Sequence, residues 1–203
     1  VKRYKDGDLI AARGDPPDEW IACARGAVRV SSTSISGKQI TLTYVEPGIW
    51  FGDVAIFDGD RRTHDAYAHG DSTILCVAKA DFKKILATHV ELYEAMLRLH
   101  ARRIRQLFGL VEDLNTLPLR ARLAKQLVHL VRSYGVPSLA DAREMRISLH
   151  LAQEELAQLL GASRQRVNQE LKAMEREESI RIEPGGLVIR NRDALMRISE
   201  ADN

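Results

Sequence analysis

Cysteines, aromatic residues and long apolar runs are all scarce in this sequence. The two cysteines, Cys23 and Cys76, lie far apart and outside any CxxC or Cys/His spacing. One chain cannot build a zinc site or an iron–sulfur cluster from them, so we predict two partly buried thiols and no metal site. The N-terminus has no basic segment followed by an apolar run, and no stretch reaches the roughly 18 apolar residues of a membrane span. We therefore expect a cytoplasmic protein that does not contact a membrane.

A strong charge of one sign is also missing. The 203 residues include 30 Lys and Arg against 28 Asp and Glu, which gives a formal net charge of +2 at pH 7. This mildly basic balance tolerates DNA binding but does not indicate it. A composition of 45% hydrophobic and 29% charged residues is that of an ordinary globular protein, with one large core or two modest ones. The function therefore has to be inferred from local patterns.

Residues 1–88 are divided into short runs by turn-forming residues. Turns are marked by Gly14-Asp15-Pro16-Pro17, Pro47-Gly48 and Asp58-Gly59-Asp60. Between them lie runs with period-two alternation and β-branched residues, such as 27–30 and 40–45. Turn signals every 8 to 12 residues or so predict an all-β sandwich or roll. We therefore place a small β domain over residues 1–88.

The segment from Glu91 to Leu114 predicts one long helix. It has no proline, and its apolar residues recur at alternating spacings of four and three, as in a heptad seam. At about 1.5 Å per residue the helix would be roughly 36 Å long, and homodimerisation would cover its apolar face. Burial of the helix wholly within its own chain is the alternative. A second apolar stripe, expected to cover the β domain, consists of Leu92, Met96, Leu99, Phe108 and Leu110. The predicted dimer interface consists of Tyr93, Leu97, His100, Ile104, Leu107, Val111 and Leu114.

The run Asn115-Thr116-Leu117-Pro118 breaks the helical pattern, because proline cannot continue a helix interior. We predict a hinge here, which makes residues 89–116 the dimerisation helix and hinge and residues 117–203 a separate domain. Leu119–Ser133 then predicts an amphipathic helix. Residues 134–138, which contain Gly135 and Pro137, predict a loop.

The most informative stretch runs from Leu149 to Leu171. A first short helix buries Leu156, Leu159 and Leu160, and Gly161 stands where that helix must end in a left-handed turn. Ser163 caps a second helix whose core face has apolar residues at spacings of four and three. The first helix lacks such a cap, because Ala152 stands where Ser or Thr would normally cap it. The pattern predicts a helix-turn-helix.

The second helix has the composition of a DNA recognition helix. Arg and Gln side chains can make paired hydrogen bonds to guanine and adenine edges in the major groove. Downstream, the runs Ile180-Arg181-Ile182 and Leu187-Val188-Ile189 flank Glu183-Pro184-Gly185-Gly186 and predict a β-hairpin, hence a wing. A helical hairpin without a DNA role is the alternative. The predicted DNA-binding residues are Ser163, Arg164, Gln165, Arg166, Asn168, Gln169 and Lys172.

Nearly the whole chain resembles the Crp/Fnr family of bacterial transcription regulators. The motifs that carry the resemblance are Gly7-Asp8, 47–53, Arg62-Thr63, 101–103 and above all 156–167. It implies an α+β fold in which a β-roll, a jelly roll like those that bind cyclic nucleotides, precedes a long dimerisation helix and a C-terminal winged helix-turn-helix. The implied partners are double-stranded DNA and a second copy of the chain, with RNA polymerase left open as a third.

The resemblance also implies roles for single residues of the recognition helix. Arg164, Gln165 and Gln169 fall on base-reading positions, and Arg166 falls close to the phosphate backbone. Gln165 and Gln169 replace the Glu and Arg of the best-known members, which predicts a changed operator. The operator should still be a near-palindrome with half-sites about one helical turn, ~34 Å, apart.

Whether the β-roll binds cyclic AMP depends on a few positions. In relatives that bind cyclic nucleotides, a Gly-Glu pair contacts the ribose and an Arg-Ser or Arg-Thr pair contacts the phosphate. This chain offers Gly52-Asp53 and Arg62-Thr63, but the Asp53 side chain is one methylene shorter than Glu. Leu107 and Phe108 take the positions that face adenine, and apolar groups there would leave its polar atoms unpaired, at about 1–3 kcal/mol each. We therefore disfavour cyclic AMP as the cofactor and expect a different small-molecule effector or none.

The sequence leaves two alternative functions open. The first is a regulator of the same fold that binds DNA without any effector. The second is a phosphate-processing enzyme at Arg62, His64 and Asp65, near His69 and Asp71, since imidazole and carboxylate groups can act as acid, base or metal ligand. On alternating strand residues these groups would not share one face, which favours solvated side chains and no enzyme.

Overall fold

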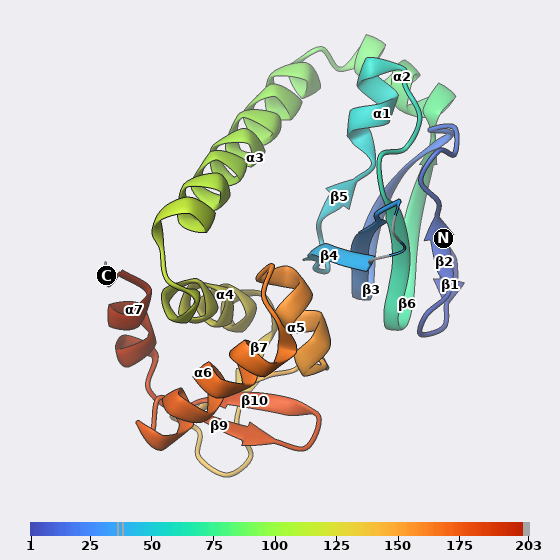
Figure 1. Ribbon diagram of the computed structural model, residues 1–203. Coiled ribbons are helices and arrows are strands. Elements are labelled where there is room, and N and C mark those ends of the chain that lie inside the picture. The colour runs from blue at the N-terminus through green and yellow to red at the C-terminus, as the bar shows by residue number, and fades with distance from the viewer. Residues whose placement is uncertain (36, 38, 201–203) are drawn as a thin grey trace. The chain divides into compact units, whose positions relative to one another are not determined.

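The computed structural model describes residues 1–35, 37 and 39–200. The chain forms two compact units, Val1–Gln106 and Leu107–Asn203, whose division falls inside the long helix α3 (Figure 1). Of the predicted C-terminal domain, residues 201–203 lie outside the described part. The predicted α+β order, a β domain followed by helices and a C-terminal helix-turn-helix, is confirmed.

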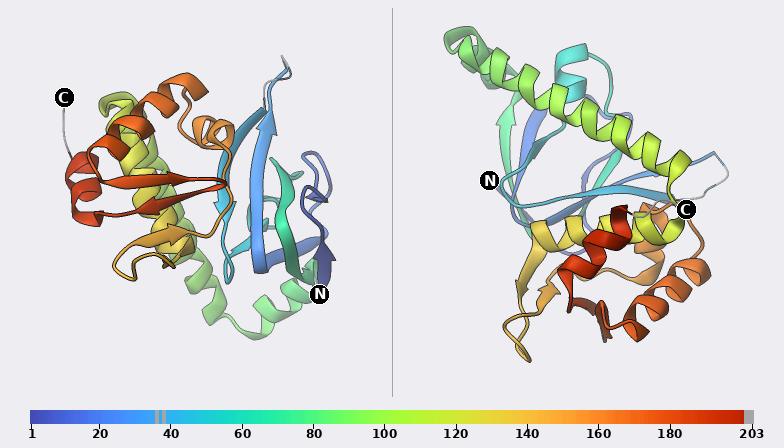
Figure 2. Two further views of the ribbon diagram at one scale, coloured as in Figure 1. Left: turned by 90° about the horizontal axis from the view of Figure 1, so that it is seen from below. Right: turned by 90° about the vertical axis from the view of Figure 1, so that its left-hand side faces the viewer.

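An antiparallel sheet forms most of the first unit (Figure 2). Its main strands follow the order β1-β6-β3-β4, and β2 pairs with β6 while β5 pairs with β3. A short helix, α1 (Asp53–Asp58), lies between β5 and β6, and a second, α2 (Lys79–Thr88), follows β6. The strands are β1 (Lys2–Tyr4), β2 (Leu9–Ala11), β3 (Glu19–Thr33), β4 (Gln39–Val45), β5 (Trp50–Phe51) and β6 (Asp65–Ala78).

Alternating apolar residues of the long strands build the core of this unit. Ile21, Val28 and Ile74 are almost fully buried in one cluster of sheet residues. A second cluster joins the sheet to the helices through Phe82 of α2, and the ring of Trp20 lies 4.4 Å from the Phe82 ring. These clusters hold β5 and α1, and two of the predicted effector residues, Gly52 and Asp53, lie where these two elements meet.

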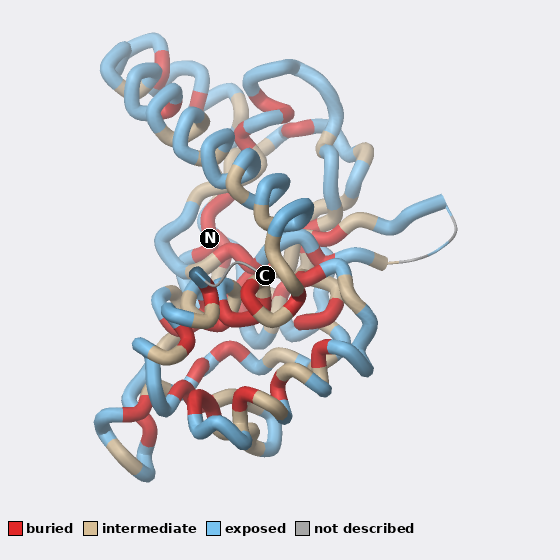
Figure 3. Tube along the Cα trace, turned by 60° about the vertical axis from the view of Figure 1, so that its left-hand side comes forward, coloured by how far each residue is buried: buried red, intermediate tan, exposed pale blue. Residues whose placement is uncertain are grey.

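Helix α3 (Glu91–Thr116) begins where predicted and extends two residues beyond the predicted Leu114. Most of its length is exposed (Figure 3). Only part of the second predicted apolar stripe is covered. Met96 is buried and Leu92 packs against the Phe82 cluster, whereas Phe108 and Leu110 are exposed. Within the described residues, every helix of the chain is too short or too polar to cross a membrane.

The second unit combines helices with a four-stranded antiparallel sheet of order β7-β8-β10-β9. The prediction of a loop over residues 134–138 is wrong, because Gly135–Pro137 forms β7. It pairs with β8 at the edge of the sheet, where a proline is tolerated because the lost N–H has no partner strand. The elements are α4 (Leu119–Tyr134), β7 (Gly135–Pro137), β8 (Met145–Ile147), α5 (Gln153–Leu159), α6 (Arg164–Arg176), β9 (Ile180–Glu183), β10 (Gly186–Ile189) and α7 (Arg192–Glu200).

Candidate nucleic-acid interface and effector site

Helices α5 and α6 form the predicted helix-turn-helix. Gly161 has a φ of 60°, a left-handed conformation that glycine adopts without a steric cost, and it turns the chain between the two helices. The Ser163 hydroxyl accepts a hydrogen bond from the backbone N–H of Arg166 at 3.3 Å and caps α6. Val167, Leu171 and Met174 are buried, as the spacing predicted. The sequence signals of cap, glycine and core face are therefore all realised.

The opposite face of α6 is open to solvent. Asn168 differs from the other predicted DNA-binding residues, because it is half-buried and its Oδ1 accepts a hydrogen bond from Gln153 Nε2 at 3.3 Å. This bond joins the first turn of α5 to the middle of α6, which gives Asn168 a positioning contact within the domain. The exposed residues are Ser163, Arg164, Gln165, Arg166, Gln169 and Lys172.

Two arginines of α4 hold the motif in place. Arg122 Nη1 donates to the carbonyl of Leu160 at 2.9 Å, at the end of α5, where a cation also complements the helix dipole. Arg120 forms ion pairs with Glu170 at 3.6 Å and with Glu177, both on the α6 side of the domain. Sequence reasoning missed these arginines, since no local pattern connects α4 to partners 38 to 57 residues away.

In the β domain, Asp53 is already bound by protein groups. Its side chain is 1% exposed, and Arg103 Nη1 lies 3.0 Å from Oδ1 and 2.8 Å from Oδ2. His100 Nε2 lies 2.5 Å from Oδ2. Arg103 also donates from Nη2 to the carbonyl of Trp50 at 2.6 Å. The Asp53 carboxylate thus ties α1 to α3, and Arg103 also ties β5 to α3.

The other predicted effector residues are more open. Arg62 is half-buried and donates from Nη2 to the carbonyl of Glu19 at 2.8 Å. Its guanidinium lies against Gly52, where an added Cβ would come within 2.6 Å of Nη1. The Thr63 hydroxyl is 2.7 Å from Nδ1 of His64. The structure therefore places Gly52 and Arg62 together.

Leu107 and Phe108, the remaining predicted effector residues, are exposed on α3. So are the predicted interface residues other than His100, namely Tyr93, Leu97, Ile104, Leu107, Val111 and Leu114. The side chain of His100 is mostly covered, and its ring meets the Phe57 ring edge-on at 5.6 Å.

The groups of the suggested enzyme site are engaged separately. Asp65 Oδ1 accepts from the backbone N–H of Arg13 at 2.8 Å, and Asp71 pairs with Lys5 at 2.9 Å. The His69 ring contacts the Tyr44 ring. Burial and the nearby Arg13 charge lower the pKa of His64. Among the described residues, no three His, Cys, Asp or Glu side chains gather in a group that could hold a metal ion.

Comparison with known proteins matches both units. Residues 1–89 match the cyclic nucleotide-binding domain, and residues 121–198 match the Crp-like helix-turn-helix domain. The chain is 30% identical to the "CRP-like cAMP-activated global transcriptional regulator" of Mycobacterium tuberculosis over 96% of its own length and 85% of that protein.

Solved structures agree with this match. A CRP/FNR-family transcriptional regulator from Thermus thermophilus is 25% identical with a TM-score of 0.78, over 100% of this chain and 99% of that one. FixK2 from Bradyrhizobium japonicum shares the fold with a TM-score of 0.86 at 19% identity, over 98% of this chain and 96% of that one.

Proposed function

Because this chain belongs to the Crp/Fnr family and is a DNA-binding transcriptional regulator, we propose that it acts as a homodimer that reads a near-palindromic operator. The observation that carries this proposal is the face of α6. Arg164, Gln165 and Gln169 are exposed there above a fully buried apolar face. Arginine and glutamine can each make two hydrogen bonds to one base edge, which supports base reading by these side chains.

The remaining exposed groups suit the DNA backbone. Arg166 and Lys172 are cations on the same open face, and Ser163 lies at the N-terminus of α6, where free N–H groups favour a phosphate. Such contacts position the protein on DNA without reading sequence. As a DNA-binding regulator the protein would work in the cytoplasm, and RNA polymerase is left open as a further partner.

The exposed apolar seam of α3 supports the dimer. Leu97, Ile104, Leu107 and Val111 repeat at heptad spacing, and each is more than half exposed. Exposed apolar stripes of this kind mark interaction sites, and a second α3 with the same seam would bury them. The two-fold axis of such a dimer would impose a near-palindrome on the operator.

We propose further that cyclic AMP does not gate this regulator. The Mycobacterium relative is named as cAMP-activated, whereas Asp53 here is fully occupied by Arg103 and His100. A ribose hydroxyl would have to displace one of these partners, and the loss of a hydrogen bond to this buried carboxylate costs about 1–3 kcal/mol. Another small molecule in the β-roll, or none, fits the protein better.

An enzymatic function at Arg62, His64 and Asp65 has less support. The Asp65 carboxylate accepts from the backbone of Arg13, and the His64 ring contacts Thr63. General acid–base work needs paired groups aimed at one reacting atom. Unaltered substrate in a phosphodiesterase assay is the expected result, and turnover abolished by His64→Ala would establish the enzyme instead.

The decisive experiment is selection of bound duplexes from a random DNA pool by the purified protein, with and without cyclic AMP. We expect a two-fold symmetric motif in both pools and its loss with Arg164→Ala. Arg176→Ala, at the far end of α6, removes the same charge and should still select the motif. Absence of any enriched motif in both pools would contradict operator reading, and enrichment only with cyclic AMP would contradict the effector proposal.

A further inference from the structure

The wing turn between β9 and β10 contains no basic residue. Its sequence is Glu183-Pro184-Gly185-Gly186. Affinity for DNA depends strongly on Lys and Arg contacts to phosphates. A wing without a cation at its turn therefore needs one from a neighbouring segment if it is to bind the backbone.

The wing turn lies next to the helix-turn-helix. A Cβ added at Gly185 would come within 2.6 Å of the His150 ring, and His150 precedes the start of α5 by three residues. Gln153, the first residue of α5, is hydrogen-bonded to Asn168 of α6. On the other side, the backbone N–H of Ile182 in β9 donates to Glu175 of α6 at 2.7 Å. These contacts place the wing beside the recognition helix.

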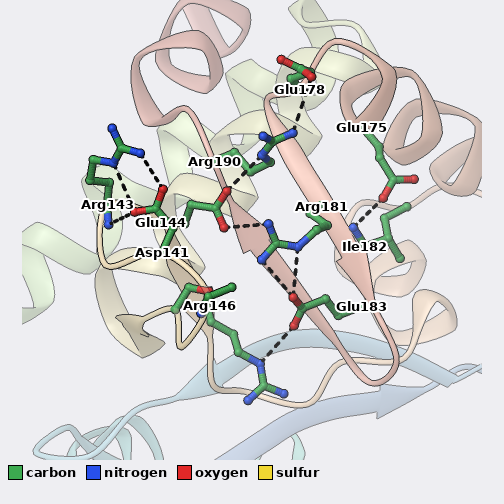
Figure 4. Close-up of polar contacts among 12 residues, drawn as sticks. Asp141, Arg143, Glu144, Arg146, Glu175, Glu178, Arg181, Ile182, Glu183 and Arg190 are labelled. Carbon is green, nitrogen blue, oxygen red and sulfur yellow. Dashed lines mark hydrogen bonds and ion pairs between the residues drawn. The ribbon is translucent and has the colours of Figure 1, made fainter.

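One face of the wing sheet carries its charges (Figure 4). Val188 of β10 stands directly opposite Arg146 of β8 and Arg181 of β9, and Gly186 stands opposite Glu183. Directly opposite residues of antiparallel strands share a face, so these side chains lie on the same side of the sheet. The other side contributes Ile147, Ile180 and Ile189 to the core.

Two of the arginines in this network are held firmly. The buried Glu144 carboxylate accepts from Arg181 Nη1 at 2.7 Å and from Arg190 Nε at 3.0 Å. Arg181 also pairs with Glu183 at 3.0 Å. Releasing either guanidinium would leave a largely desolvated carboxylate short of a partner, which is costly. Neither is free to move to a phosphate.

Arg146 is held loosely by comparison. Its side chain is 45% exposed, and its Nε lies 3.7 Å from Glu183 Oε2, which is beyond hydrogen-bond distance. The guanidinium lies over Gly186, where a Cβ would be 3.6 Å from Nε. An exposed ion pair of this kind contributes little to stability, so exchanging Glu183 for a phosphate would cost little.

We propose that Arg146 is the phosphate-binding cation of the wing and that Glu183 holds it near the turn when DNA is absent. The proposal rests on the proposed role of α6 in DNA binding. A phosphate contact carries no sequence information, so Arg146 should contribute equally on every duplex and should release about one counterion on binding.

The test is the salt dependence of DNA affinity for Arg146→Gln, measured by fluorescence anisotropy. Two duplexes of about 30 base pairs are used, one selected by the wild type and one of random sequence. We expect the slope of log K against log salt to become shallower by about one on both duplexes. The ratio of the wild-type DNA affinity to that of Arg146→Gln should fall about 3.5-fold between about 50 and about 200 mM salt. Arg146→Lys should restore the slope.

Arg143→Gln is the matched control. It removes the same charge from the segment just before β8, but Arg143 is 90% exposed and paired with Asp141 at 2.9 Å. Its slope should stay that of the wild type. Glu183→Gln should bind more tightly with an unchanged slope, because Arg146 loses its competing carboxylate.

The outcomes separate the two proposals. An unchanged slope for Arg146→Gln, or an equal loss for Arg143→Gln, would overturn the role of Arg146. If the selection enriches no motif, operator reading fails, and the random duplex still decides whether Arg146 contacts phosphate. Thermal unfolding of each variant at the wild-type midpoint confirms that the sheet is intact.

Discussion

Asp53 shows how a single residue differs from its expected role. From the sequence, its short side chain was expected to fall short of a ribose. In the structure the same carboxylate reaches Arg103 and His100 of α3 and is satisfied within the chain. Whether a carboxylate is free or engaged depends on partners 47 and 50 residues away, which no local spacing indicates.

Asp53→Asn should destabilise the β domain by about 1–3 kcal/mol. The amide removes the negative charge that pairs with Arg103, and the part exposure of Arg103 reduces the penalty because water screens its charge. Urea unfolding followed by fluorescence of the adjacent Trp20 and Trp50 rings measures the change. Asp71→Asn, at an exposed ion pair, is the control, and equal stability of both variants would contradict a structural role for Asp53.

The Cys23 thiol makes the free energy of unfolding depend on pH in the alkaline range. Burial raises the pKa of its thiol from 9.0 to about 11. The folded chain therefore holds this proton more tightly than the unfolded chain, and the resulting stabilisation is complete below about pH 9 and is lost as pH rises toward 11. Urea unfolding measures the free energy of unfolding at about pH 8 and at about pH 10.5. Between these two pH values it should fall less for Cys23→Ala than for the wild type. Equal losses would refute this assignment.

At the scale of single elements, α5 begins with half of a capping box. Ala152 has the extended backbone of an N-cap, with φ −67° and ψ 149°, and its N–H donates to Glu155 Oε2 at 3.0 Å. Alanine has no side-chain acceptor for the first free N–H groups of the helix. The missing cap noted in the sequence is thus only partly offset by Glu155.

Ala152→Ser should complete the box and stabilise the C-terminal unit by about 1 kcal/mol, because the hydroxyl accepts from the Glu155 N–H. Thermal unfolding should show a rise of roughly 4–8 °C for a domain of this size. Ser163→Ala, which removes the existing cap of α6, should give a shift of similar size in the opposite direction. A midpoint unmoved by Ala152→Ser would mean that α5 needs no further cap.

At the scale of the whole molecule, the exposed apolar seam of α3 is the proposed homodimer interface. Ile104→Asp should yield a monomer in analytical ultracentrifugation, because a charge in an apolar seam cannot be paired by an identical helix. Loss of the second half-site contact should weaken operator binding about a hundredfold or more. Ala95→Asp introduces the same charge at an exposed position off the seam and should leave the dimer intact. A dimeric Ile104→Asp protein would contradict the proposed interface.

The sequence by itself determined the order of the parts and the elements whose signals are local. The cap, glycine and core spacing of the helix-turn-helix and the long helix all depend on residues within a few turns of one another, so periodicity reveals them. The wing runs 180–182 and 187–189 likewise became β9 and β10, each one residue longer.

Tertiary structure alone decided which side chains meet across long separations. Strand β7 exists because β8 supplies its partner, so Gly135 and Pro137 did not prevent a strand. Folding also brought Asp53 to Arg103, Arg122 to Leu160 and Arg146 to the wing turn. The physical reason is that hydrogen bonds and ion pairs require atoms within a few ångströms, and separations of tens of residues leave no trace in local composition.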